Sequence, residues 1–338
     1  MRTAVLRQVA RIEIEECAVP RPGDGEVLVE IRAVGLCGSD VAAFRGRHPF
    51  RAPPVVLGHE GAGRVVEAGA GAALPAGTRV AVLPLVSCRQ CGHCEQGLSH
   101  LCTHRRLPGA GLPGLLSRYV AVPRSALVPL PDDLSYAEGA LVEPAAVAWH
   151  TVRAAGVRHG TRLAVLGAGP VGHLTAAVAR LHGAGELLVS DVREPALSLV
   201  ARTTGCRTVN ARAGAVDGAG RTDAFDAVVV ASGHPTCLDE ALALCRPRGT
   251  VVVLPMFADA VRAGLNPLVL KEVRIRGSSL YGPDDFRAAA AADAVARRVL
   301  DVRPLVEAEP APLAAAQSAF EALDQGSEVL KFFLDPAR

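Results

Sequence analysis

The chain has 338 residues, of which 50% are hydrophobic, and its formal net charge is +2. This length predicts about two domains of roughly 150 residues each, and no apolar run in the sequence approaches the roughly 20 residues that span a membrane. A small net charge offers no strong field for nucleic acid or anionic lipid, and the N-terminus lacks the apolar core of a signal peptide, so we expect a cytoplasmic metabolic protein without nucleic-acid or membrane partners.

The first part of the chain, roughly residues 1–140, predicts an irregular, β-rich domain. Its expected strands are short apolar runs between Gly and Pro turns, at 26–32, 63–67, 79–83 and 117–122. The pattern Ser135-Tyr-Ala-Glu138 then fits a capping box that begins a helix. We interpret this helical segment as the link to the next domain.

Three separated polar segments in this first part can supply metal ligands. Cys37 lies in Gly-Leu-Cys-Gly-Ser-Asp, His59 and Glu60 are adjacent, and Glu143 precedes a proline. Taken singly, each has an ordinary structural explanation, such as a core cysteine or a carboxylate at a helix end. Together they can form a mixed sulfur, nitrogen and oxygen shell with an open position, as catalytic zinc requires.

A cysteine-rich loop follows, with the spacing C-x2-C-x2-C-x7-C. Four thiolates on one short loop can enclose a tetrahedral ion, and a closed shell of this kind is typical of structural zinc. An iron–sulfur cluster is disfavoured, because the common bacterial spacing ends in C-x3-C-Pro. The predicted ligands are Cys88, Cys91, Cys94 and Cys102.

The remaining cysteines and the nearby histidines are expected to be structural. Small apolar surroundings predict core positions for Cys17, Cys206, Cys237 and Cys245. Since four thiolates complete a zinc shell, surface positions are predicted for His93, His100 and His104.

From residue 162 onward, short apolar strands alternate with amphipathic helices, which predicts a parallel sheet covered on both faces. The strand at 162–166 leads into a G-x-G-x-x-G turn that begins a helix. In that context the motif is typical of dinucleotide binding, because its glycines let backbone approach a pyrophosphate at a helix N-terminus. The predicted turn residues are Gly167, Gly169, Pro170, Val171 and Gly172.

Asp191 ends the next predicted strand and is expected to bind the adenosine ribose. Its carboxylate repels a 2′-phosphate and so favours NAD, while Arg193 leaves NADP as a weaker alternative. Ser232 and Leu254, at the ends of two later strands, are predicted to position the nicotinamide.

The sequence resembles the zinc-dependent medium-chain dehydrogenase/reductase family over essentially the whole chain. Glu143, where liver-type alcohol dehydrogenases carry a cysteine, points to the polyol branch of sorbitol, L-idonate, threonine and butanediol dehydrogenases. The matching motifs, in order, are Cys37-Gly-Ser-Asp40, Gly58-His-Glu60, the four-cysteine loop, Val142-Glu-Pro144 and the glycine turn.

The resemblance implies an α/β chain of two domains. A β-rich, GroES-like catalytic domain is expected at 1–146 and 287–338, and a doubly wound Rossmann domain at 147–286. It further implies two zinc ions per chain, one structural and one catalytic, and a homodimer or homotetramer. The catalytic ion is expected on Cys37, His59 and Glu60, with Glu143 as a fourth or exchanging ligand.

Two positions depart from relatives. Where many carry a histidine that ends a proton relay, this chain has Ala42, and His48 is the nearest substitute in the sequence. Where sorbitol dehydrogenases place an Arg-Tyr pair that holds polyol hydroxyls, this chain has Leu280 and Tyr281. The second departure weakens the expectation that sorbitol itself is the substrate.

The predicted reaction is reversible hydride transfer from a secondary alcohol to NAD, giving a ketone. The candidate alcohols are polyols, cyclitols, sugar acids and amino alcohols, and Ser39 is the predicted acceptor of the hydroxyl proton. Two alternatives stay open: a zinc-free quinone or enone reductase on the same fold, and a non-catalytic binding protein derived from a dehydrogenase.

Overall fold

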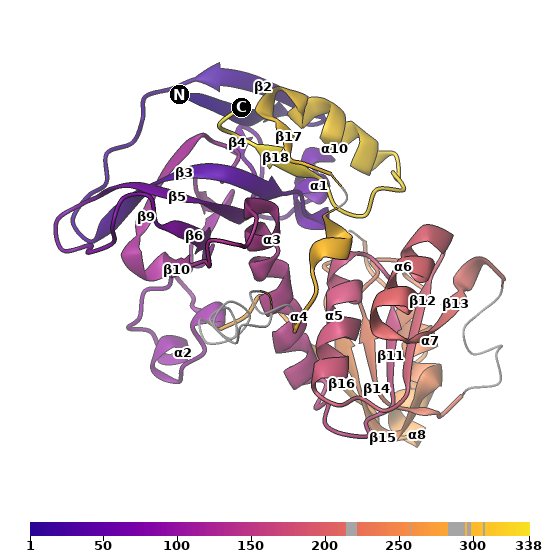
Figure 1. Cartoon of the computed structure of the whole chain (residues 1–338). Coiled ribbons are helices and arrows are strands. Elements are labelled where there is room, and N and C mark those ends of the chain that lie inside the picture. Colours follow the sequence, from indigo (N-terminus) through magenta and orange to yellow (C-terminus); the bar gives the residue numbers. More distant parts are fainter. Residues whose placement is uncertain (214–221, 258, 283–294, 296–298, 307) are drawn as a thin grey trace. The chain divides into compact units, whose positions relative to one another are not determined.

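The computed structural model describes residues 1–213, 222–257, 259–282, 295, 299–306 and 308–338 (Figure 1). The chain folds as two units. Unit 1 comprises Met1–Glu143, Gly282–Arg298 and Leu305–Arg338, and unit 2 comprises Pro144–Tyr281 and Val299–Pro304. The chain passes from unit 1 to unit 2 in the first turn of helix α4 (Val142–Ala154).

Unit 1 is built on a largely antiparallel seven-stranded sheet whose central strand is β3 (Glu26–Gly35). This strand pairs with β5 and β9 and, near its end, with β18. The other strands of the sheet are β10 (Leu127–Pro129), β6 (Arg79–Val82), β5 (Glu60–Ala68), β18 (Phe333–Asp335), β17 (Ala311–Pro312) and β9 (Tyr119–Pro123). The strand therefore joins segments that lie far apart in the sequence.

Smaller elements complete unit 1. Helix α10 packs on α1 through a stacked pair of rings, Phe44 and Phe320, whose centroids are 5.4 Å apart. The further strands are β1 (Arg2–Gln8), β2 (Arg11–Glu16), β4 (Val55–Val56), β7 (Leu107–Pro108) and β8 (Gly111–Leu112). The helices are α1 (Gly38–Phe44), α2 (Gly92–Glu95), α3 (Tyr136–Ala140) and α10 (Ala316–Asp324).

Unit 2 is a six-stranded parallel sheet with helices, as the alternating pattern predicts. The strand order matches the doubly wound dinucleotide-binding order, in which the first strand of the unit is central. In that spatial order the strands are β13 (Arg207–Asn210), β12 (Leu187–Asp191), β11 (Leu163–Leu166), β14 (Phe225–Val230), β15 (Cys245–Val253) and β16 (Arg274–Gly277). The helices are α5 (Pro170–Leu181), α6 (Glu194–Thr204), α7 (Cys237–Leu244) and α8 (Asn266–Leu270).

Several sequence-based expectations need correction. The apolar run at 329–334 predicts a strand, but the structure limits the strand to β18 at Phe333–Asp335. Cys17 was expected in the core but is exposed, because it follows the edge strand β2. His100 was expected at the surface but is only 7% exposed. Ala-rich segments from residue 285 onward predict helices; residues 283–294 lie outside the described residues, and α10 is a described helix of this part of the chain.

The Ser135 capping box is confirmed, since Ser135 N–H donates to Glu138 at 2.8 Å and Glu138 N–H donates to Ser135 Oγ at 3.2 Å. Within the described ranges, no helix is both long and apolar enough to cross a membrane. The longest described helix, α4, has 13 residues.

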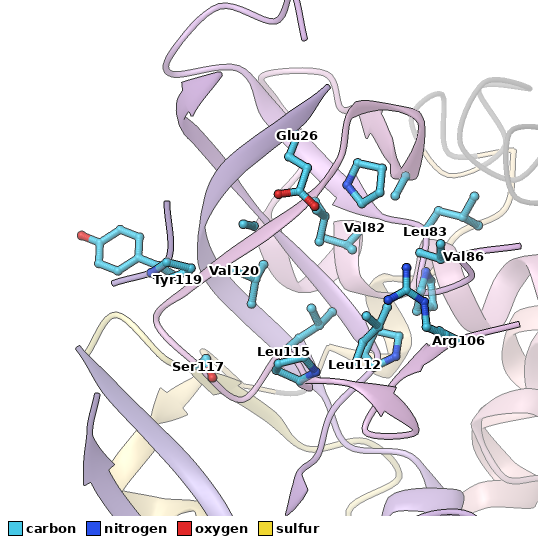
Figure 2. Close-up of a pocket in the computed structure, with 18 of the residues that line it drawn as sticks. Glu26, Val82, Leu83, Val86, Arg106, Leu112, Leu115, Ser117, Tyr119 and Val120 are labelled. Carbon is cyan, nitrogen blue, oxygen red and sulfur yellow. The ribbon is translucent and has the colours of Figure 1, made fainter. Parts of the chain in front are cut away.

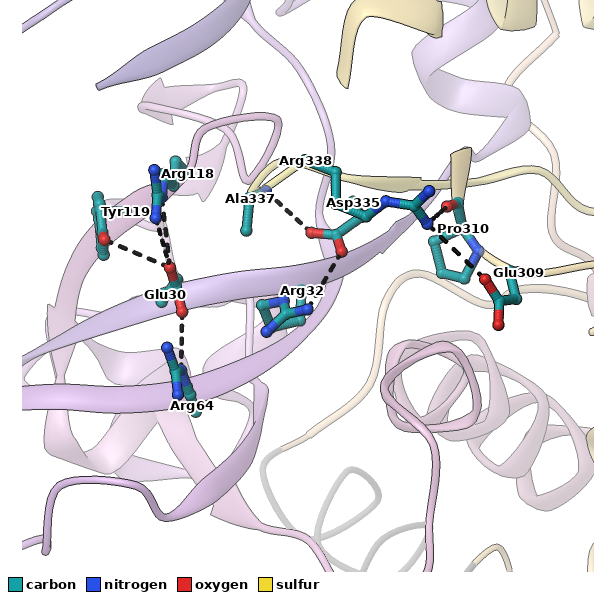
Figure 3. A network of polar contacts seen from close by, with 10 residues as sticks. All are labelled: Glu30, Arg32, Arg64, Arg118, Tyr119, Glu309, Pro310, Asp335, Ala337 and Arg338. Atoms are coloured by element: carbon teal, nitrogen blue, oxygen red, sulfur yellow. Dashed lines mark hydrogen bonds and ion pairs between the residues drawn. The ribbon is translucent and has the colours of Figure 1, made fainter. Parts of the chain in front are cut away.

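A buried carboxylate stabilises the centre of unit 1 (Figure 3). Glu30 on β3 is 3% exposed. It accepts hydrogen bonds from Arg64 Nε at 2.7 Å, from Arg118 Nη2 at 3.2 Å and from the Tyr119 hydroxyl at 3.3 Å. Burial raises the pKa of Glu30, but the two arginines lower it by more, so the pKa lies below its usual value.

We predict that Glu30→Gln lowers the thermal midpoint by about 2–6 °C at pH 7, because a charge-assisted network loses about 1–3 kcal/mol. A carboxylate with a lowered folded-state pKa stabilises above its unfolded pKa of about 4.3, and this contribution is lost as the pH falls through the folded pKa. Thermal unfolding from pH 7 to pH 3 should therefore show the two proteins converging in acid. Glu15→Gln, in an exposed pair with Arg7, is the control and should change little. A difference in thermal midpoint between wild type and Glu30→Gln that does not narrow in acid contradicts this account.

Candidate metal and dinucleotide sites

Three of the predicted ligands come together in unit 1. Ligand atoms of Cys37, His59 and Glu60 all lie within 4.8 Å of one another. Cys37 lies two residues after the end of β3 and is the N-cap of α1, while Glu60 starts β5. Antiparallel pairing places Gly35 opposite Glu60, and a Cβ at position 35 would stand 2.5 Å from Glu60 Oε2, so a side chain there would displace the Glu60 carboxylate.

This donor set fits a zinc ion. Thiolate, imidazole and carboxylate are the ligands that zinc prefers, and three protein ligands leave one position open. In a tetrahedral site the ligand atoms lie about 3.3–3.8 Å apart, which these side chains reach with small movements. The set is buried or half-buried, so an ion held here is largely surrounded by protein.

Asp40 orients the histidine. It is fully buried, and its Oδ1 lies 3.3 Å from His59 Nδ1. Its other oxygen accepts the Cys37 backbone N–H at 3.2 Å. Burial lowers the pKa of His59, but the Asp40 charge raises it by more, so the pKa lies well above its usual value. Because Nδ1 faces Asp40, Nε2 is left for a metal, an arrangement typical of zinc-binding histidines.

A buried lysine from the C-terminal segment neutralises Glu60. Lys331 forms an ion pair with Glu60, and their side chains are 2% and 1% exposed. Burial lowers the pKa of Lys331, but the charges of Glu60, Cys37 and Glu143 raise it by more. Glu143 is 4% exposed and is not among the three residues whose ligand atoms converge. The structure therefore places Glu143 within electrostatic reach of this group but outside the ligand cluster.

Ser39 contacts an arginine rather than a histidine. Arg51 Nη1 donates to Ser39 Oγ at 3.1 Å and to Asp40 Oδ1 at 3.0 Å. His48 instead accepts the Phe50 backbone N–H on Nδ1 at 3.2 Å. Burial, followed by the positive charge of Arg51, lowers the pKa of His48 to about 4.

The four-cysteine loop brings its sulfurs together. Neighbouring Sγ atoms are 3.6 Å apart for Cys91 and Cys94, 3.9 Å for Cys91 and Cys102, and 3.5 Å for Cys88 and Cys102. A tetrahedral zinc with bonds of about 2.3 Å separates its sulfurs by about 3.8 Å, whereas disulfide sulfurs are about 2.05 Å apart. The backbone N–H of His104 also donates to Cys102 Sγ at 3.3 Å. The loop therefore fits a closed four-thiolate site.

The predicted dinucleotide turn has the required backbone in unit 2. Gly167 adopts a left-handed φ of 112°, and a Cβ there would stand 3.1 Å from Ser232 N. Gly172 must lack a side chain, because its Cβ would stand 1.9 Å from Gly167 O. Gly169 caps α5 at its N-terminus. The free N–H groups of the first turn are thus presented where an anion can bind.

Asp191 is tied to this turn. Its Oδ2 accepts the Ala168 N–H at 2.7 Å, and its Oδ1 accepts the Arg193 N–H at 2.9 Å. The Arg193 side chain also donates to both oxygens, at 3.2 and 3.3 Å. Burial raises the pKa of Asp191, but these donors lower it by more, so the carboxylate stays charged.

The other predicted cofactor residues lie on the same unit. Ser232 and Leu254 follow the ends of β14 and β15, as expected.

The two residues that stand in place of the polyol-binding Arg-Tyr pair lie at the end of the same unit. Tyr281 is 0% exposed, and Leu280 before it has a left-handed φ of 54°.

A pocket in unit 1 lies apart from the metal-ligand cluster (Figure 2). It has a volume of about 280 Å³, and its wall is mainly apolar, with Val82, Leu115 and Val120 among its residues. Cys37, His59 and Glu60 do not line it. The pocket therefore plays no part in the assignment of the metal site.

Comparison with known proteins agrees with this geometry. Residues 23–132 match the family described as alcohol dehydrogenase GroES-like domain, and residues 170–295 match the family described as zinc-binding dehydrogenase. Sorbitol dehydrogenase 1 of Saccharomyces cerevisiae is 34% identical over 345 residues, which cover 97% of this chain and 96% of that protein. The chain belongs to the zinc-binding alcohol dehydrogenase family.

Solved structures of this family share the whole fold. L-idonate 5-dehydrogenase from Escherichia coli has a TM-score of 0.91 and 28% identity, covering 99% of this chain and 97% of that one. A protein of Sinorhizobium meliloti solved with NADP has a TM-score of 0.91 and 29% identity, covering 99% of both chains. The predicted family and its polyol branch are confirmed. The dehydrogenase is thus an NAD(P)-dependent oxidoreductase that acts on CH–OH groups.

Two site residues of this dehydrogenase were not predicted from the sequence. The rarity of lysine could have indicated a role for Lys331, because it is one of only two lysines among 36 basic residues. Arg51 gave no such signal, since it is one arginine among many. Both side chains are buried against acidic groups, which only the folded backbone brings near them.

We predict that Lys331→Met destabilises the metal-free dehydrogenase by about 3–5 kcal/mol, because Glu60 becomes a buried charge without its partner. A zinc ion on Glu60 supplies the missing positive charge. Thermal unfolding of chelator-treated and zinc-reloaded protein should therefore show a larger zinc-induced rise in midpoint for the variant than for the wild type. The control is Arg45→Met, whose partner Asp324 is on the surface. Equal rises in all three proteins contradict the prediction.

Proposed function

We propose that this dehydrogenase oxidises a secondary alcohol to a ketone, reversibly, with zinc and NAD. The observation that carries the proposal is the convergence of Cys37, His59 and Glu60 within 4.8 Å. A zinc-free reductase has no use for such a buried thiol, imidazole and carboxylate. We assign two zinc ions to each chain, one at this cluster and one at the four-cysteine loop.

At the catalytic cluster, the proposed ligands are Cys37, His59 and Glu60, with Glu143 as a fourth or exchanging ligand. Zinc bound there supplies Lewis acidity, which stabilises negative charge on the substrate oxygen. Asp40 holds the His59 ring in one orientation, and Lys331 balances the charge of Glu60. Ser39, two residues after Cys37 and half-buried, is the proposed contact for the substrate hydroxyl.

NAD is the proposed cofactor. The pyrophosphate binds at the Gly167–Gly172 turn, and Asp191 receives the ribose hydroxyls. Arg193 already pairs with Asp191, so this arginine is engaged and not offered to a 2′-phosphate. Ser232 and Leu254 are proposed to contact the nicotinamide end.

The proposed substrate is a small alcohol with neighbouring polar groups: a polyol, cyclitol, sugar acid or amino alcohol. The support comes from the names of relatives, which include sorbitol and L-idonate dehydrogenases. Leu280 does not offer the hydrogen bonds of an arginine. We therefore rank sorbitol below sugar acids and cyclitols, and NADH formation across a panel of secondary alcohols tests this order.

We also propose that the protein is a symmetric homo-oligomer built through the edge of the unit 2 sheet. Strand β16 is an edge strand of this sheet, and its residues are exposed along its whole length. Just before it, α8 exposes Val269 and Leu270 at 73% and 84%. Two copies of such an edge can pair across a two-fold axis, giving a dimer or a pair of dimers. Light scattering after size-exclusion chromatography measures the state.

The proposed compartment is the cytoplasm. All nine cysteines are unpaired, and the two proposed zinc sites need thiolates. A reducing environment keeps the cysteines unpaired and the thiolates available to zinc.

The main test is Cys37→Ser. We expect it to reduce the zinc content from two ions to one per chain and to lower alcohol oxidation by at least about 10³-fold, because a ligand of the Lewis acid is lost. Metal analysis and NADH formation are the measurements. Cys245→Ser, at a buried thiol of unit 2, is the matched control and should keep both ions. If Cys37→Ser retains two ions and full activity, the proposed site is wrong.

A second test concerns the cofactor. We expect Asp191→Ala to raise the KM for NAD by at least about 10-fold, since a charged hydrogen bond to ribose contributes about 1.5–3 kcal/mol. It should also improve the relative use of NADP, because the repulsive carboxylate is gone and Arg193 is released. Glu186→Gln, in a surface pair of the same unit, is the control. An unchanged NAD to NADP ratio contradicts the assigned role of Asp191.

A further inference from the structure

The apolar pocket of unit 1 takes no part in the proposed reaction (Figure 2). Its volume of about 280 Å³ is close to the lower limit of the roughly 300–1,000 Å³ found for small-molecule pockets. Val82 on β6 and Val120 on β9 belong to its wall, and both strands are paired within the seven-stranded sheet. Leu115 also lines the pocket, and its N–H donates to Gly58 O at 2.9 Å. This wall is therefore formed without a ligand.

A buried hydroxyl group interrupts the apolar wall. Ser117 lines the pocket and is 3% exposed. Its backbone forms an isolated bridge with Thr3, but its hydroxyl makes no hydrogen bond with the rest of the described chain. Burying a hydroxyl without a partner is unfavourable. The Ser117 side chain thus favours an occupant of the pocket that carries a hydrogen-bonding atom.

Two charged residues also line the pocket, Glu26 and Arg106. Glu26 Oε2 accepts the Gly23 N–H at 3.0 Å. The Arg106 side chain is exposed, and within the described ranges its guanidinium has neither an ion pair nor a hydrogen bond. In Figure 2, Glu26 and Arg106 lie on different sides of the pocket, and Leu115 lies between Arg106 and Ser117. The pocket therefore presents a cation and a hydroxyl with an apolar surface between them.

The backbone of Arg106 is fixed at the base of the four-cysteine loop. The Val86 N–H donates to Arg106 O at 3.0 Å, and the Arg106 N–H donates to Val86 O at 2.9 Å. Val86 itself lines the pocket. Because this pair fixes the start of the arginine side chain, less conformational entropy is lost when the guanidinium binds an anion.

We propose that this pocket binds a small carboxylic acid with an apolar chain and a second polar group at its far end. The Arg106 guanidinium can donate two parallel hydrogen bonds to the carboxylate. The apolar wall packs against the chain, and the Ser117 hydroxyl bonds the second polar group. Glu26 repels a carboxylate placed beside it, which favours one orientation of the ligand.

Calorimetric titration of the whole chain with octanoate, octanol and octylamine tests the charge of the ligand. We expect octanoate to bind at least about 10-fold more tightly than the other two, because hydrogen bonds between ions are the strong ones. Arg106→Gln should leave octanoate no tighter than octanol. Arg105→Gln is the matched control, since Arg105 is exposed and does not line the pocket. Equal binding of the three probes by the wild type, or a preference for octanoate that survives Arg106→Gln, overturns the proposal.

A carboxylate can also bind zinc, so the location of the bound acid needs its own test. The Cys37→Ser protein, in which we expect no catalytic ion, should bind octanoate as the wild type does. Leu112→Trp enlarges a half-buried side chain of the pocket wall and should abolish binding, with an unchanged thermal midpoint without ligand as the check on its folding. Loss of binding in Cys37→Ser, or its persistence in folded Leu112→Trp, overturns the proposal. A wild type that lacks zinc or alcohol oxidation refutes the proposed function instead and leaves these titrations valid.

The far end of the ligand is tested with ω-hydroxyoctanoate and its shorter and longer homologues. At the chain length that spans the pocket, we expect the wild type to bind the hydroxy acid about 3–10-fold more tightly than the plain acid, because the second hydroxyl reaches Ser117. Ser117→Ala should make the two acids equal and change the affinity for octanoate by less than about twofold. Equal affinity of hydroxy and plain acids at every length in the wild type overturns the assigned role of Ser117.

Discussion

The antiparallel pairing of β3 with β5 is the constraint on which the metal-ligand cluster depends. It sets Gly35 opposite Glu60, and Cys37 follows Gly35 by two residues. A shift of one residue would turn Glu60 to the other face of the sheet and separate the ligands. The core side chains of β3 resist such a shift, since Val27, Val29 and Ile31 are all 0% exposed. Packing of the sheet therefore determines the position of the chemistry.

The same region concentrates buried charge, and each charge has an opposite partner. Asp40 contacts Arg51 and His59, while Glu60 pairs with Lys331. Burying an ionised group without such a partner costs several kcal/mol. These pairs offset the cost of burial and orient the ligands in the folded chain. They also explain how two buried carboxylates, Asp40 and Glu60, can lie at one end of the sheet without unfolding the domain.

In unit 2, by contrast, the predicted dinucleotide site is formed mainly by glycines and backbone N–H groups. Gly172 permits the helix to approach the preceding turn, and Gly167 supplies the left-handed backbone that the turn needs. Asp191 is held by an N–H of that turn and by Arg193. Recognition of a dinucleotide here depends on peptide N–H groups and one carboxylate, so a short motif contains most of the information.

The sequence by itself determined the features that are local in the chain. The glycine turn, the four-cysteine loop and the Ser135 capping box each lie within one short stretch of the chain, of 15 residues at most, and their spacing dictates their geometry. The strand and helix alternation likewise predicted the parallel sheet, because periodicity reports burial directly. Tertiary structure alone decided which distant charges meet. Lys331 reaches Glu60 only after the C-terminal strand β18 has paired with β3. Arg51 lies closer in sequence to Asp40, but no local pattern encodes which of many arginines becomes buried.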